Sequence, residues 1–271
     1  CIRDSQKNFY LGATLLAMSL GLMLGPAFAA MFIDEKASAL TWSLPFFIMA
    51  ALFAVSAAML CFSMKDPAAV KGLKLSQIDW LGGLRDLRKL MDSGKSRRLI
   101  AIFCLNQVGA GAFFAAVPLV LESSGGFSPR EIAAFLSAEG IFSGAVFAFF
   151  GPMLLKRTSL KNALVIGLSA SVITIAVPLV FDNYFALWSI TILQATGFGI
   201  TYFTTLAIFS ENAPDGKRGW VLSVLSSLWG LTMGGGLALC GVLAGISNAT
   251  CVSACLMLCA AALFISRKTS V

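Results

Sequence analysis

The chain has 271 residues, of which 58% are hydrophobic and 12% are Asp, Glu, Lys or Arg. A soluble domain carries about 25% charged residues, so this composition and a mean hydropathy of +0.86 exclude an ordinary soluble fold. The absence of histidine excludes histidine-based acid–base catalysis and nearly all histidine-containing metal sites. A net charge of +7 is compatible with a nucleic-acid-binding protein. The positions of the basic residues along the chain decide whether that interpretation holds.

Taken in chain order, eight apolar segments are long enough to form transmembrane helices, which need about 20 residues. Continuous apolar runs with internal Gly and Pro are typical of membrane helices, whereas the strands of a membrane barrel alternate apolar and polar residues. The sequence therefore predicts an all-α fold, a polytopic helical membrane protein with eight transmembrane helices. These helices are expected at residues 9–33, 40–64, 99–121, 130–155, 160–181, 184–209, 220–246 and 249–265.

The basic residues predict the orientation of these helices. Of the 20 Lys and Arg residues, 18 fall in segments on one side, and only Lys36 and Arg130 fall on the other. Short loops rich in Lys and Arg stay in the cytoplasm, so both termini of the chain are expected there. We expect the plasma membrane as the location, or the inner membrane if the source is a bacterium. Because alternate loops account for the positive charge, no nucleic-acid partner is predicted.

The seven cysteines do not indicate a metal or redox site. Cys251, Cys255 and Cys259 share one helical face inside an apolar run, where Cys acts as a small hydrophobic side chain. Packing is therefore the expected role of these thiols. No metal and no cofactor are predicted.

A weak internal repeat predicts how the helices are grouped. Residues 7–12 and the apolar run after them resemble residues 217–222 at an offset of 210, which also places Gly25 onto Gly235. If the first and seventh helices are equivalent, the repeat contains six helices. Residues 1–64 are then the last two helices of an N-terminal half, whose first four helices would lie upstream. Residues 65–98 form a cytoplasmic linker with a short amphipathic helix, and residues 99–271 form a complete C-terminal six-helix half.

Gly21, Gly25 and Pro26 form the most specific motif of the sequence. Glycines four residues apart let another helix approach closely, and a proline bends its helix; ordinary helix packing explains the same residues. With the predicted topology, this motif resembles the antiporter motif of proton-coupled exporters in the major facilitator superfamily. The turn containing Arg218 and Gly219 is similar to an Arg-Gly turn of that family. The resemblance implies two six-helix halves, here with an incomplete N-terminal half, that transport solutes by alternating access.

Glu139 is the one formal charge expected deep inside a predicted helix. It lies nine residues after Arg130, about 13 Å along an α-helix, in a hydrocarbon core about 30 Å thick. A carboxyl group in such surroundings favours its neutral form, which suits a group that gains and loses a proton during transport. Proton coupling or recognition of a cation is one interpretation. A structural hydrogen bond and a shallower position than expected are the alternatives.

Three amide side chains are also expected inside helices: Asn106, Gln107 and Gln194. In the family resemblance, their helices line the central cavity, where an amide that both donates and accepts hydrogen bonds would orient a substrate. Hydrogen bonds between helices explain the amides equally well. An aromatic wall for the same cavity is expected from Phe113, Phe114, Tyr202 and Trp229.

The favoured function is secondary active transport, with proton-coupled efflux of a small amphipathic molecule. The expected partners are that molecule, protons and the lipid bilayer, and a monomer is favoured. Proton- or cation-coupled uptake of a small metabolite is an alternative, as is a non-transporting fragment or scaffold on a transporter fold. An enzyme is not predicted, because the sequence has neither paired carboxylates within a helix nor a nucleophile with a base partner.

Overall fold

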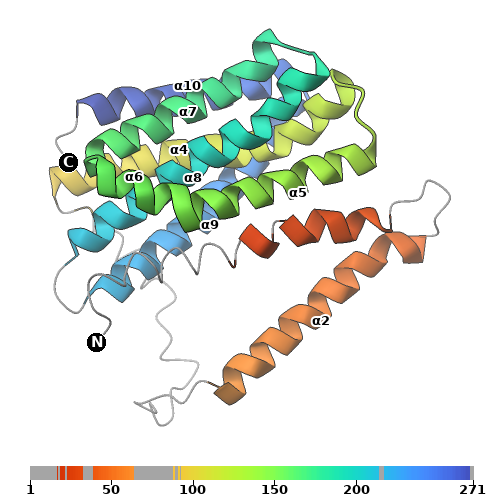
Figure 1. The fold of residues 1–271 in the computed structure, drawn as a ribbon, viewed down its shortest axis with the longest axis horizontal. Helices are drawn as coiled ribbons and strands as arrows, with labels where there is room; N and C mark the ends of the chain where they lie inside the picture. The colour runs from red at the N-terminus through yellow and green to blue at the C-terminus, as the bar shows by residue number, and fades with distance from the viewer. Residues whose placement is uncertain are drawn as a thin grey trace.

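The computed structural model describes residues 17, 19–21, 23–32, 39–63, 88, 91, 93–213 and 217–268. In these residues every regular element is a helix (Figure 1). A short apolar helix covers Ser19–Ala30 and is followed by α2 (Ala39–Ser63). The remaining elements are α4 (Gly94–Ser123), α5 (Pro129–Ala145), the π-helix η2 (Val146–Phe150), α6 (Gly151–Arg157), α7 (Leu160–Val180), α8 (Tyr184–Glu211), α9 (Arg218–Ala244) and α10 (Asn248–Arg267).

Six helices of the described residues are long and apolar enough to cross a membrane, with α5, η2 and α6 counted as one. They match the last six predicted segments, which confirms a polytopic all-α membrane protein. The largest difference is at the start of α4, which begins at Gly94 and not near residue 99. Ser93 caps that helix by accepting a hydrogen bond from the backbone N–H of Ser96, so the polar first turn is helical as well.

Short, capped connections make successive helices run in opposite directions. Ser128, Ser159, Asn183 and Ser247 each accept a hydrogen bond from a backbone N–H of the helix that follows, which satisfies a donor that the helix itself cannot pair. The loops between α6 and α7 and between α9 and α10 contain two and three residues. As a result the basic ends of α4, α6, α7, α9 and α10 gather at one end of the bundle, on the left in Figure 1.

The centre of the bundle consists of α4 and α8. In their most apolar 18-residue stretches, 67% of α4 and 83% of α8 are buried, against 22% of α9 and 33% of α10. The α4–α9 contact is a close approach of two backbones at Gly111 and Gly236. A Cβ on Gly236 would lie 2.7 Å from the backbone nitrogen of Ala112, so only glycine fits there.

The α4–α10 contact is made by cysteines and a glycine. Cys259 Sγ lies 2.7 Å from the position that a Cβ on Gly109 would occupy. Together with Cys240, Cys251 and Cys255 it belongs to one buried apolar cluster, and each thiol is at most 1% exposed. The cysteines therefore fill space between helices. Among the described residues, no group of three His, Cys, Asp or Glu side chains has a geometry that could hold a metal ion.

The first two predicted helices are described only in part. The second corresponds to α2, which Figure 1 shows apart from the bundle and whose Phe46, Phe53 and Phe62 are 68–87% exposed. Of the first predicted helix, the structure describes the segment Ser19–Ala30. The proposed repeat at residues 7–12 and most of the proposed amphipathic linker helix lie outside the described residues.

Candidate functional site

Glu139 lies in α5 on the side that faces α8. Phe135, one turn earlier, places its ring 5.7 Å from the ring of Trp188 in α8. Val146, two turns later, approaches α8 so closely that a Cβ on Gly199 would lie 3.1 Å from Val146 Cγ1. Residues spaced by whole turns share a helix face, so Glu139 points into the same interface. Its side chain is 1% exposed.

The N-terminal end of α5 is fixed by polar and aromatic contacts with α8. Ser128 and Glu131 form a capping box, in which each side chain accepts a hydrogen bond from the backbone of the other residue. Tyr184 of α8 donates a weak hydrogen bond of 3.4 Å to Glu131, and its ring stacks on Phe127 at 4.8 Å. These contacts set the depth of α5. Glu139 therefore lies ten residues, or about 15 Å, from the helix start at Pro129.

Glu139 has no basic partner in the described spans. Every Lys and Arg of the six helices lies within five residues of a helix end, whereas Glu139 is near the middle. Its Oε2 atom has no hydrogen-bond partner. A lone ionised carboxylate in hydrocarbon is costly, and a carboxyl group kept in such a position is a candidate functional residue.

Asn106 is fully buried where α4 crosses α8. On its helix it lies between Phe103 and Phe113, whose rings are 6.2 and 6.3 Å from Tyr202 and Phe198 of α8. Neither amide atom of Asn106 has a hydrogen-bond partner. The structure thus places an unpaired amide at the central helix crossing.

The other two predicted amides are also buried in the bundle. Gln107 is 3% exposed and its Nε2 atom has no partner, and Gln194 is 1% exposed with both amide atoms unpaired. No hydrogen bond joins either of them to Asn106 or Glu139 in the described structure. Gln194 is ten residues from the start of α8, about 15 Å, and so lies at a similar depth to Glu139. Asn106 and Gln107 are 17 and 16 residues, about 25 Å, from the end of α4 that adjoins α5, so they lie deeper than Glu139 and Gln194 and do not bond to them.

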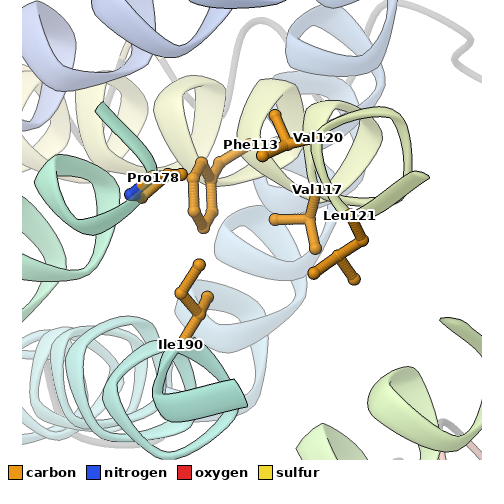
Figure 2. Close-up of a pocket in the computed structure, with 6 residues that line it drawn as sticks. All are labelled: Phe113, Val117, Val120, Leu121, Pro178 and Ile190. Carbon is orange, nitrogen blue, oxygen red and sulfur yellow. The ribbon is translucent and has the colours of Figure 1, made fainter. Parts of the chain in front are cut away.

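Two of the four predicted aromatic residues are in contact. Tyr202 of α8 and Trp229 of α9 have ring centres 5.9 Å apart, and Tyr202 also meets Phe103 of α4, which the sequence analysis did not single out. Phe113 pairs with Phe198 and lies with its ring between Pro178 and Ile190 in a hollow between α4, α7 and α8 (Figure 2). That hollow is lined by apolar side chains only and has no room for a water molecule, so it is a packing gap and not a binding site.

The antiporter-like motif lies in the helix Ser19–Ala30. None of the described residues lies within 4 Å of a Cβ built on Gly21 or Gly25, so these glycines make no close contact with the described helices. Pro26 is partly buried. At the other predicted turn, Arg218 begins α9, and Gly219 has open space around its Cβ position.

Sequence reasoning missed two features of the bundle interior. Thr201 and Thr204 of α8 are buried hydroxyls without a hydrogen-bond partner, and their abundance in membrane helices gives them no distinguishing signal. The π-helix at Val146–Phe150 was expected to be ordinary helix. The pair Gly151-Pro152 directly after it was the available signal, because proline removes a backbone donor from the helix.

The comparisons with known proteins agree with this architecture. The bundle of six long apolar helices is that of a polytopic membrane protein. The family model of the Major Facilitator Superfamily matches residues 2–237, and the chain belongs to that family. The fold is similar to the crystal structure of a Major Facilitator Superfamily transporter, FucP, in the outward conformation, with a TM-score of 0.63 and 16% identity. The match covers all of this chain and 70% of that chain. No curated protein matches.

These findings confirm the family and the expectation of a transporter fold and not an enzyme. A secondary transporter that works by alternating access is what the fold implies. The chain is an integral, multi-pass membrane protein.

Proposed function

We propose that this chain performs proton-coupled efflux of a small amphipathic molecule, with Glu139 as the group that carries the proton. The observation that carries the proposal is the buried carboxyl group of Glu139, whose Oε2 is unpaired and which has no basic residue near it in the described spans. Intramembrane carboxyl groups of this kind mark proton pathways in transporters.

The coupling follows from the cost of burying a charge. When the bundle is closed around Glu139, the neutral acid is favoured, because the ionised form would lose its hydration without gaining a partner. When the site opens to water or to a cationic substrate, the ionised form is stabilised. Proton release is thereby linked to the open state, and proton uptake to closure. One carboxyl group can exchange a proton for a substrate in this way.

The polar and aromatic residues buried in the bundle support the proposed substrate class. Asn106, Gln107 and Gln194 offer amide donors and acceptors, and Tyr202 and Trp229 offer aromatic surface. Export is supported by the similarity of Gly21, Gly25 and Pro26 to an antiporter motif. Coupled uptake of a metabolite would use the same carboxyl group with the opposite direction of substrate movement.

The test is accumulation of ethidium, an amphipathic dye, by inside-out vesicles with an acidic interior, alongside equilibrium binding to the same vesicles. The wild type is expected to accumulate the dye. Glu139→Gln should bind it without accumulating it, because the amide keeps the shape and lacks the titratable proton. Glu139→Asp should retain partial activity with a shifted pH profile. Glu122→Gln, at an exposed site, is the matched control and should behave as the wild type.

Accumulation by Glu139→Gln at the wild-type level and with the same pH dependence would assign Glu139 a structural role. Accumulation by right-side-out vesicles with an acidic exterior would replace export by uptake.

A further inference from the structure

The helix that carries Glu139 is interrupted two turns later by the π-helix η2. The backbone N–H of Gly151 donates to the carbonyl of Val146, five residues earlier, where an α-helix would use the carbonyl four residues earlier. Pro152 follows and has no N–H to donate. The backbone ladder of this span is therefore weakest between Val146 and Pro152.

One side of η2 is packed tightly against α8. A Cβ on Gly151 would lie 3.0 Å from Cδ1 of Phe203, and a Cβ on Gly199 would lie 3.1 Å from Cγ1 of Val146. Glycines on both helices permit this approach, and no space remains between them. The π-helix cannot move further toward α8.

The opposite side of η2 borders an open cavity among the described residues. This cavity of about 310 Å³ lies between α5 with η2 and the helix Ser19–Ala30. Phe149 of η2, which lines it, is 71% exposed. The described lining is almost entirely apolar and combines small residues with large ones: Ser19, Leu20, Met23, Gly140, Ile141, Gly144, Ala145, Ala148 and Phe149.

Both ends of the span are fixed. The N-terminal end is tied to α8 by the contacts of Glu131 and Tyr184, and the C-terminal end continues into α7 through Thr158 and Ser159 alone. A swing of a whole half-helix is therefore restricted. The motion that remains is a local displacement of the π-helix into the cavity.

We propose that η2 is the moving element of this span, and that it shifts between its present position and one in which it occupies the cavity beside Ala145 and Ala148. Such a shift bends the part of α5 nearest to η2. It therefore moves Glu139, which lies seven residues before Val146, relative to α8, while the first turns of α5 around Ala134 stay in place. The inference rests on the backbone and the cavity and holds whichever solute or ion is transported.

The experiment measures distances between nitroxide labels on the protein in lipid nanodiscs. One pair joins Phe150→Cys in η2 to Phe264→Cys in α10, and a second joins Ala134→Cys in α5 to the same α10 site; all three positions are exposed. Cys1, Cys61 and Cys104 are replaced by alanine. The buried Cys240, Cys251, Cys255 and Cys259 stay, because they are at most 1% exposed and do not react with the label.

Two populations are expected for the pair from Phe150 and one for the pair from Ala134. Ala145→Leu adds three carbon atoms to the cavity and should remove the second Phe150 population. The matched control is Ala134→Leu, the same substitution on an exposed face of the same helix, measured with the Phe150 pair. It should leave both populations.

A single narrow distribution for the Phe150 pair in the unsubstituted span would overturn the proposal. Two populations in both pairs would also overturn it, since the whole helix would then move as a rigid body. The wild-type span alone gives this answer, so the result does not depend on how well Ala145→Leu folds.

Discussion

Asn106 shows what a buried polar residue without a partner costs. An unsatisfied buried donor or acceptor destabilises a fold by about 1–3 kcal/mol, and Asn106 has both its amide atoms unpaired where α4 crosses α8. A residue kept for stability alone would be apolar at this position. We therefore propose that the amide serves an interaction made in another conformation or with a substrate. Glu139 follows the same logic with a larger cost, because its ionised form would be a buried charge.

Replacing Asn106 with leucine separates these roles. Leucine has a similar size and no polar atoms, so Asn106→Leu should leave the thermal unfolding midpoint in detergent unchanged or raise it by a few degrees. If Asn106 orients the substrate as proposed, dye accumulation should fall strongly. A midpoint lowered by several degrees would show instead that the amide has a structural hydrogen-bond partner. Thr196→Val, at an exposed hydroxyl of α8, serves as the control for loss of a polar atom.

Helices in this bundle pack through glycine and cysteine as much as through large side chains. Between two membrane helices there is little hydrophobic driving force, so close van der Waals contact supplies much of the attraction. Gly111 and Gly236 provide it between α4 and α9, and Gly109 and Cys259 provide it between α4 and α10. By contrast, Gly21 and Gly25 make no such contact with the described residues, because nothing lies within 4 Å of their Cβ positions. Some helical glycines of this chain therefore mediate close packing between helices, and others do not.

Alanine substitutions in α9 test this distinction. In Gly236→Ala the new Cβ would meet the α4 backbone, which cannot move aside as a flexible side chain would, and overpacking of this kind costs about 1–3 kcal/mol. The unfolding midpoint should fall, and the monodisperse fraction in size-exclusion chromatography should fall with it. Gly235→Ala, at the adjacent residue with nothing within 4 Å, should behave as the wild type. Equal behaviour of the two variants would mean that α4 and α9 are not in backbone contact.

The whole molecule combines a shared fold with a divergent sequence. It superposes on a transporter structure with a TM-score of 0.63 at 16% identity, so the helix arrangement persists where few residues do. The described helices have a common distribution of charge along their length. Basic residues gather at one end of the bundle, and the other end carries Arg130 and the aromatic cluster of Phe127, Tyr184 and Trp188. Aromatic residues of this type favour the membrane interface.

The orientation of the bundle is testable by labelling from outside the cell. On a background without reactive native cysteines, Ser124→Cys in the loop between α4 and α5 should react with a membrane-impermeant maleimide in intact cells. Arg157→Cys, at the end of α6, should react only after permeabilisation. Cysteines at residue 36 and in residues 68–96 should follow the first and second pattern, respectively. Reaction of Arg157→Cys in intact cells would reverse the proposed orientation.

The sequence by itself determined the membrane-spanning helices of the described bundle, the clustering of basic residues and the depth of Glu139. These features follow from local composition, because hydrocarbon demands about 20 apolar residues per span and places charges at span ends. Even the start of α4 was misjudged by only five residues, since Gly94 to Arg98 are polar and helical at once. The family resemblance depended on such local patterns as well.

Only the tertiary structure decided which residues meet. The contact of Gly111 with Gly236, the fit of Cys259 against Gly109 and the crossing at Asn106 depend on the angle and register between helices, and hydropathy carries no information on either. The π-helix at Val146–Phe150 arises because Pro152 removes a donor while α8 holds Val146 and Gly151 in place. The missing donor of Pro152 can be recognised in the sequence. The contact of Val146 and Gly151 with α8 exists only once the helices are packed.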